Sequence, residues 1–169
     1  IVKKPNIAPW YYEIENLGYN CRLTDIHCAL GISQMKRLNK FIERRREIVR
    51  KYQEAFKNIS EIILIKEETF AKTAWHIYPI QFDLEKLNIG RKEIFEQLAE
   101  KGIMCQVHYV PVHFMPFYQN NFGYKKGDFP ITEKYYEQAI TLPLFPKLTN
   151  QQVEYIIDSV KEIINANKK

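Results

Sequence analysis

The chain has 169 residues, of which 46% are apolar and 27% are charged, and this balance is typical of a folded globular protein and not of a disordered one. No run of about eighteen uncharged apolar residues occurs, so we expect no membrane-spanning helix. The formal net charge is +5, but the basic residues between positions 44 and 51 alternate with glutamates at helical spacing. That spacing indicates a solvated helix face and no nucleic-acid partner.

The cysteines and the start of the chain bear on its cellular setting. Cys21, Cys28 and Cys105 are an odd number at wide spacing, which argues against a disulfide framework and favours a reducing, cytoplasmic location. Residues 1–5 do not have the pattern of a signal peptide, and the first residue is not methionine. We expect from this a trimmed chain or a fragment.

Two helices are predicted in the first third of the chain, after an irregular stretch over residues 1–23. Thr24 is a suitable N-cap, and apolar residues recur at helical spacing from there to Leu38. Gly31 is unfavourable inside this helix unless another backbone packs closely against it. A second amphipathic pattern covers residues 39–57. We interpret residues 1–58 as an interface loop and a helical connecting arm.

Strands and helices are predicted to alternate through the rest of the chain. Pro79 indicates an edge position or a bulge in its strand, and residues 112–129 are predicted to form a long connection of a kind that is often functional. The apolar patterns predict strands at 62–65, 73–82, 103–109 and 140–144, and helices at 91–101, at 130–139 and after Thr149.

This order of elements indicates an α+β fold with partly α/β character, built in two layers. We expect residues 59–169 to form a small domain with a mixed sheet and helices on one face. The helical arm of residues 1–58 would precede it.

Four short sequences, in this order along the chain, carry a recognisable pattern. They are Gly18–Ile26 (GYNCRLTDI), Trp75–Tyr78 (WHIY), Val107–His113 (VHYVPVH) and Leu142–Pro146 (LPLFP). Together they resemble the DegT/DnrJ/StrS family of sugar aminotransferases, and the likeness runs from about residue 10 to the last helix.

The resemblance implies a fold, a cofactor and an activity. The family has the fold-type I architecture of enzymes that use pyridoxal 5'-phosphate (PLP), and this chain would supply the small C-terminal domain. The resemblance further implies a homodimer with shared active sites. This enzyme would move an amino group from an amino acid, glutamate being the expected donor, to a 4-keto nucleotide sugar for bacterial cell-surface or flagellar glycans. The runs Pro9–Glu13 and Glu43–Val49 are similar to members that act in pseudaminic acid synthesis.

The resemblance also implies site residues. Asn20 and Arg22 match residues near the PLP phosphate of the neighbouring subunit, and an amide and a guanidinium are both suitable phosphate donors. His108, Tyr109 and His113 match the segment that lines the sugar-nucleotide pocket. These are expectations carried over residue by residue.

Tyr12 and Trp10 are further candidates, which would stack on a sugar or base face from the partner subunit. Ordinary structural roles compete with the functional ones: Asn20 and Arg22 also suit a turn and a helix start. The alternative function is a stand-alone, non-catalytic dimerisation or binding module of the same fold.

One family feature is missing from the chain. The family lysine that forms the Schiff base with PLP belongs to a Ser-Phe-His-x-x-Lys-type motif upstream of Asn20, and no such motif occurs here. Lys3 and Lys4 are too close to Asn20 to serve as that lysine. We therefore predict no catalytic residue in this chain, and no transamination by the chain alone.

Cys105, His108 and His113 have a spacing that raises the question of a metal or nucleophile site. On a strand, Cys105 and His108 point to opposite faces, so we predict no metal site. A Cys–His nucleophile pair would need an activating motif, which the surrounding sequence lacks.

Overall fold

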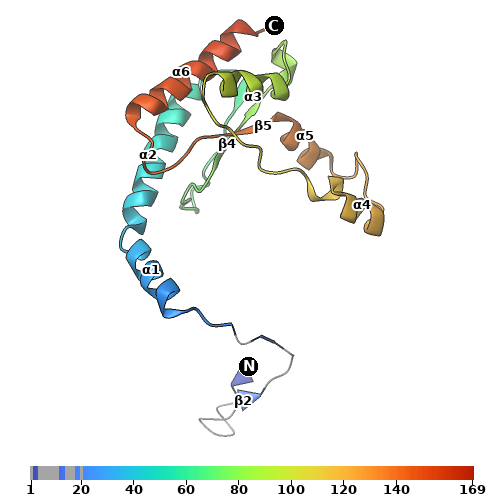
Figure 1. Cartoon of the computed structure of the whole chain (residues 1–169). Coiled ribbons are helices and arrows are strands. Elements are labelled where there is room, and N and C mark those ends of the chain that lie inside the picture. The colour runs from blue at the N-terminus through green and yellow to red at the C-terminus, as the bar shows by residue number, and fades with distance from the viewer. Residues whose placement is uncertain (1, 4–11, 14–17, 20) are drawn as a thin grey trace. The chain divides into compact units, whose positions relative to one another are not determined.

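The computed structural model describes residues 2–3, 12–13, 18–19 and 21–169 (Figure 1). The candidate residues Asn20 and Trp10 lie outside the described residues, and only the backbone of Tyr12 is described. The chain divides into two compact units, residues 1–37 and 38–169. The boundary at 58/59 between arm and domain stays a prediction about the whole protein.

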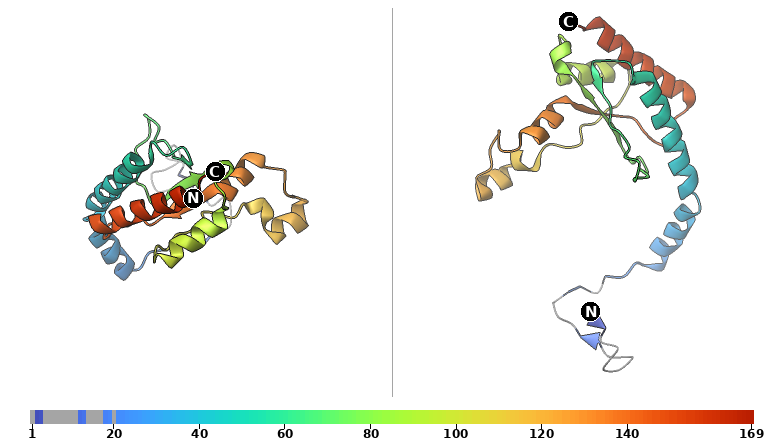
Figure 2. Two further views of the ribbon diagram at one scale, coloured as in Figure 1. Left: turned by 90° about the horizontal axis from the view of Figure 1, so that it is seen from above. Right: turned by 180° about the vertical axis from the view of Figure 1, so that it is seen from behind.

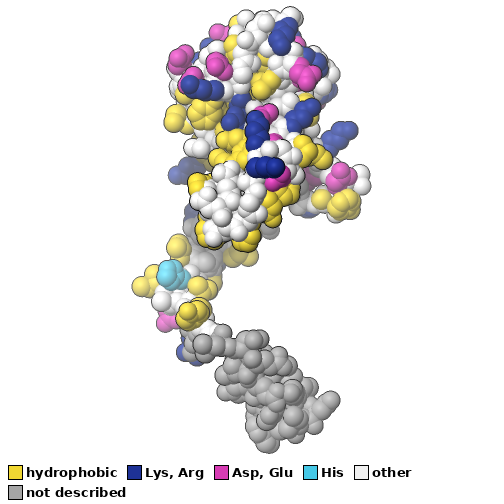
Figure 3. Space-filling view, turned by 90° about the vertical axis from the view of Figure 1, so that its right-hand side faces the viewer, with side chains coloured by type: hydrophobic (Ala, Val, Ile, Leu, Met, Phe, Trp, Pro, Cys, Tyr) yellow, Lys and Arg dark blue, Asp and Glu magenta, His cyan; other side chains and the backbone are white. Residues whose placement is uncertain are grey.

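The described part of the first unit contains one helix and a pair of short strands. Strands β1 (Val2–Lys3) and β2 (Tyr12–Glu13) form an antiparallel pair, and helix α1 covers Asp25–Met35. Thr24 caps α1 as predicted, because its hydroxyl accepts a hydrogen bond from the His27 N–H. No residue of α1 is buried, and hydrophobic side chains show on its surface in Figure 3.

The second unit is built on a three-stranded sheet in the order β3-β4-β5. Its strands are β3 (Ile62–Ile63), β4 (Tyr78–Phe82) and β5 (Ala139–Leu142). The α+β fold class is confirmed, but both pairings are antiparallel, where a mixed sheet was predicted.

Two predicted strands are shorter than expected. The strand predicted at 73–82 begins only at Tyr78, because Trp75 has φ 50° and a left-handed residue cannot continue an extended chain. The segment 103–109 makes a single bridge, from Gln106 to Thr141 of β5. Burial alternates with the predicted period of two over residues 103–106. The sequence pattern therefore predicted which side chains are buried and which are exposed, but not how few backbone hydrogen bonds the segment makes.

Pro79 lies in the central strand but has a paired neighbour on one side only. It pairs with Thr141 of β5, whereas β3 pairs only with Gln81 and Phe82 of β4. Because β3 does not pair with Pro79, the N–H that proline lacks is not needed for a backbone hydrogen bond on that side.

Helices pack against this sheet and against one another (Figure 2). Helix α2 (Leu38–Phe56), which the sequence assigned to the arm, contacts α6 (Asn150–Ala166), and α6 also contacts α3 (Arg91–Glu100). Gly102 follows α3 with φ 75°, a left-handed conformation that glycine adopts readily after a helix. Thr149 and Gln152 form a reciprocal capping box at the start of α6.

The long connection predicted at 112–129 contains its own structure. A short 3-10 turn (Val112–Phe114) leads into helix α4 (Pro116–Phe122), and α5 (Pro130–Gln138) follows. A second 3-10 turn, Leu84–Lys86, follows β4. No described helix has the length and apolar character needed to cross a bilayer.

The core lies between α2, α6 and the sheet. The amphipathic pattern predicted over residues 39–57 is confirmed, and α2 and α6 each bury an apolar stripe. Burying an apolar side chain of this size contributes about 1.5–3 kcal/mol. The stripes are Ile48, Val49, Tyr52 and Phe56 on α2, and Val153, Ile156, Ile157, Val160, Ile163 and Ile164 on α6.

Candidate functional site

Three of the four family-like sequences meet at one pocket of about 170 Å³. Its walls come from the WHIY sequence, from the segment through His108, and from the end of β5 with the residues that follow it. The lining residues are His76, Ile77, Met104, Gln106, His108, Thr141, Leu142, Pro143 and Leu144. The sequences are far apart in the chain, so the fold itself assembles this site.

Thr141 joins two walls of the pocket. It lies in β5 between Pro79 and Gln106, and its backbone exchanges hydrogen bonds of 3.1 and 2.7 Å with Gln106. Its side-chain oxygen lies 2.9 Å from Nδ1 of His108. Because this contact occupies Nδ1, the Nε2 atom of His108 is left for another partner.

Helix α2 fixes the backbone around the pocket. Nη1 of Arg45 lies 2.9 Å from the carbonyl oxygens of both His76 and Leu144, and 3.3 Å from that of Trp75. The hydroxyl of Tyr52 donates to the carbonyl of Pro143 over 2.9 Å. Partial burial lowers the pKa of Arg45 from its ordinary value.

The basic run on α2 was interpreted from the sequence as a solvated face, and this is wrong for its first part. Arg44 donates to the carbonyl of Leu148 over 2.6 Å, and Arg46 pairs with Glu67 at 2.9 Å. The guanidinium groups reach carbonyls and a carboxylate on other segments, contacts between distant residues that helical spacing alone cannot show.

His113 lies in a different setting from His108. It is buried, and its Nε2 lies 2.9 Å from Oε1 of Glu133, which is also buried. The Glu133 carboxylate accepts hydrogen bonds from the N–H groups of Gly127 and Phe129 as well. His113 is not among the residues that line the pocket around His108, and its substrate role stays a prediction.

The pKa of Glu133 reflects two opposing effects. Burial raises the pKa, but the hydrogen bonds from Gly127, His113 and Phe129 outweigh it and hold the pKa below the ordinary value. The carboxylate therefore ties the start of the 112–129 segment to its end.

The other candidate residues are exposed where they are described. Tyr109 is 73% exposed, and its ring meets the His108 ring edge-on with centroids 4.6 Å apart. Arg22 is exposed in the first unit, and among the described residues its side chain has no hydrogen bond or ion pair.

The cysteine and histidines considered for a metal have other surroundings. Cys105 is buried, and burial raises the pKa of its thiol to about 12. His108 and His113 contact Thr141 and Glu133 instead. In the described part of the chain, no group of three histidine, cysteine, aspartate or glutamate residues is arranged to hold a metal.

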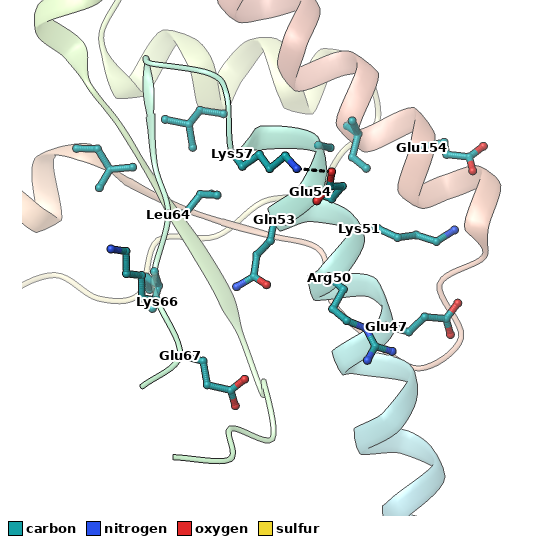
Figure 4. A pocket seen from close by; sticks show the side chains of 15 residues that line it. Glu47, Arg50, Lys51, Gln53, Glu54, Lys57, Leu64, Lys66, Glu67 and Glu154 are labelled. Carbon is teal, nitrogen blue, oxygen red and sulfur yellow. Dashed lines mark ion pairs between the residues drawn. The ribbon is translucent and has the colours of Figure 1, made fainter. Parts of the chain in front are cut away.

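A larger hollow of the second unit lies elsewhere and has different chemistry. It has about 1380 Å³ and opens between α2 and residues 62–67 (Figure 4). Its charged groups pair locally: Lys57 reaches Glu54 at 2.6 Å, as the dashed line shows, and Glu67 pairs with Arg46. None of the four family-like sequences contributes to it, so the smaller pocket is the better candidate site.

Sequence reasoning missed Thr141, Arg45 and Tyr52 at this site. Thr141 precedes the LPLFP sequence by one residue, and a strand residue next to a motif is a usable signal. Arg45 and Tyr52 lie on a helix that is 24 or more residues before every pocket wall (76 − 52), and nothing in their local sequence distinguishes them from ordinary amphipathic helix residues.

The comparisons with known proteins define the class of this chain. The model of the DegT/DnrJ/EryC1/StrS aminotransferase family matches residues 4–161, and the chain belongs to this family, whose members depend on PLP. It is 39% identical over 156 residues to the spore coat polysaccharide biosynthesis protein SpsC of Bacillus subtilis, covering 92% of this chain and 40% of SpsC.

Two further relatives refine the likeness. The UDP-4-amino-4,6-dideoxy-N-acetyl-β-L-altrosamine transaminase of Campylobacter jejuni is 32% identical over 169 residues, which is 100% of this chain and 43% of that protein. The PLP form of Spr1654 from Streptococcus pneumoniae has a TM-score of 0.79 at 32% identity, covering 93% of this chain and 40% of that one. The chain thus spans about 40% of the length of the relatives that it matches.

Proposed function

We propose that this chain is the C-terminal portion of a PLP-dependent nucleotide-sugar aminotransferase. The whole protein transfers an amino group from an amino acid, with glutamate the expected donor, to a 4-keto sugar on a nucleotide. The observation that carries the proposal is the convergence of three family-like sequences on the pocket around His108. Likeness to the C. jejuni transaminase supports a role in pseudaminic acid synthesis or a related glycan route.

Two residues of this chain would contribute to binding the phosphate of the cofactor. Arg22 offers an exposed guanidinium without a partner among the described residues, and its planar set of donors suits a phosphate. Asn20, two residues before it, would add an amide donor to the same phosphate. When bound, PLP supplies an electron sink for the transfer of the amino group, and its lysine is contributed from outside this chain.

His108 is the residue of this chain that we assign to the substrate. Its Nδ1 is fixed by Thr141 and its Nε2 is free to meet a sugar hydroxyl or a phosphate oxygen. Tyr109, beside it and exposed, offers a ring face for stacking. We propose that Tyr12 stacks on a sugar or base face from the partner subunit, and that His113 holds the segment that follows Tyr109.

Isotope transfer tests the proposed function. The whole protein, including the residues that precede this chain in its gene, is incubated with PLP, 15N-labelled glutamate and a UDP-linked 4-keto sugar, and the product is read by mass spectrometry. We expect the label in the sugar, and none with the 169-residue chain alone. Failure of the whole protein to label any 4-keto nucleotide sugar would favour the non-catalytic binding module instead.

Asn20→Ala in the whole protein tests the cofactor assignment. We expect faster loss of PLP on gel filtration, followed by its absorbance, and a lower kcat/KM. Lys3→Ala, close in sequence but assigned no role, is the matched control. Unchanged PLP retention in Asn20→Ala would remove Asn20 from the site.

A further inference from the structure

We propose that Arg45 is a positioning residue of the site: it ties the His76 wall of the pocket to the Leu144 wall, and so places His76 at the pocket that His108 also lines. This proposal rests on the proposed function, because the effect on the site is measured as binding of the nucleotide sugar. Arg45 itself does not line the pocket.

The first step of the argument is geometric. One guanidinium nitrogen of Arg45 lies 2.9 Å from the carbonyl oxygens of His76 and Leu144. These residues are 68 positions apart in the chain (144 − 76), and both line the pocket. A single planar, always charged group thus replaces a backbone ladder between the two walls.

The second step concerns the backbone before β4. Trp75 has φ 50°, a conformation that side-chain-bearing residues rarely adopt. Its carbonyl oxygen lies 3.3 Å from Nη1 of Arg45, and its ring is buried edge-on against Tyr78 at 5.6 Å between centroids. The Arg45 bonds and the buried ring together keep this turn in place, and the turn directs His76 to the pocket.

The third step concerns what the turn presents. His76 is exposed and lines the pocket, and among the described residues no hydrogen bond of its imidazole is formed. His108 lines the same pocket with its Nδ1 already engaged by Thr141. Two imidazoles with unused nitrogen atoms at one pocket provide donors for hydroxyl or phosphate oxygens of a sugar nucleotide.

Arg45 differs from its two neighbouring arginines in the groups that it contacts. It is partly buried, and burial disfavours a charge without partners. Its neighbours Arg44 and Arg46 have their own carboxylates, Glu47 and Glu67, whereas the hydrogen bonds of Arg45 all go to backbone carbonyls. Loss of Arg45 therefore acts on the backbone of the pocket walls and leaves those two ion pairs in place.

Kinetics of Arg45→Met in the whole protein test the proposal. Methionine keeps an apolar stem and removes the donors. We expect the KM for the nucleotide sugar to rise roughly tenfold while kcat changes by less than about threefold, because misplaced binding groups weaken substrate binding. Arg45→Lys should rescue part of the loss, since it keeps a charged donor but carries it on a shorter stem. Arg50→Met, an exposed position on the same helix, is the control and should match the parent.

A spectroscopic measurement separates this proposal from the proposed function. With Trp10→Phe, Trp75 is the single tryptophan of the 169-residue chain, and we expect its emission to shift to longer wavelength in Arg45→Met but not in Arg50→Met. An inactive parent protein would refute the proposed function, while an unshifted Trp75 emission would refute the positioning role. Should Arg45→Met fail to fold, Arg45→Lys decides alone, and a parental KM with parental Trp75 emission overturns the proposal.

Discussion

The two units of this chain carry parts of the same family pattern, but these parts are packed in the second unit and exposed in the first. In residues 38–169, three family-like sequences are fixed by Arg45, Tyr52 and the contact between Thr141 and His108. In the first unit, the fourth sequence leads into α1, where Leu30 remains 57% exposed. The second unit forms its pocket walls from its own residues, whereas α1 presents an apolar surface that the described residues of its unit do not cover.

Matched leucine truncations give the largest expected contrast. Leu142 of β5 is 1% exposed, and Leu142→Ala should lower the free energy of unfolding by about 3 kcal/mol through lost burial and a cavity. Leu30→Ala should change it by less than about 0.5 kcal/mol. Urea unfolding of the 169-residue chain measures both. Comparable losses in the two variants would mean that α1 packs as tightly as β5 does.

The pH dependence of stability in Glu133→Gln tests whether the hydrogen bonds of this carboxylate stabilise the second unit. The folded-state pKa of Glu133 lies below its ordinary value of 4.5, so the stability it contributes is present above that pH and is lost as the pH falls through the folded-state pKa. We expect the variant to melt lower than the parent at neutral pH, by less than Leu142→Ala does. The difference between variant and parent should shrink below about pH 4.5, and a difference that stays constant with pH would contradict the assignment.

Two stacked tyrosines provide a smaller and sharper test. Tyr52 and Tyr78 are both fully buried, with ring centroids 5.5 Å apart. Tyr52→Phe removes the donor to Pro143 and should cost about 1 kcal/mol. Tyr78→Phe removes a hydroxyl that has no partner among the described residues, and should be neutral or slightly stabilising. Thermal unfolding compares them, and equal losses would show that the Tyr52 bond contributes nothing.

Gly31 gives the smallest effect and bears on α1 directly. A Cβ at Gly31 would meet no described atom within 4 Å, so Gly31→Ala should stabilise α1 by about 0.5–1 kcal/mol, seen as increased helical circular dichroism in the 169-residue chain. If a backbone packs on α1 in the whole protein, the same variant should weaken dimer formation there. Improved helicity with an unaltered dimer would place the interface elsewhere.

Local patterns were sufficient for much of the fold. The caps at Thr24 and Thr149, the glycine after α3 and the buried stripes of α2 and α6 follow from short-range rules. The start of β4 did not follow, because Trp75 has a left-handed conformation and its carbonyl contacts Arg45, thirty residues earlier in the chain (75 − 45).

The candidate site was predictable in its motifs but not in its supports. His108 and the LPLFP sequence were identified through the family resemblance, and the structure brings them to one pocket. His113 shares a motif with His108 but lies buried on Glu133, twenty residues later (133 − 113). A histidine's partner is set by tertiary packing, and sequence spacing carries no information about it.

Activity of a mixed dimer tests most directly whether the chemistry of this chain is completed by another subunit. Two forms of the whole protein are co-expressed, one with Asn20→Ala and one with its PLP-binding lysine, upstream of this chain, replaced by alanine. If Asn20 serves the partner's cofactor, random pairing should restore about a quarter of the parental activity, because half of the dimers are mixed and each has one intact site. Activity no higher than the sum of the two variants measured separately would contradict a shared site.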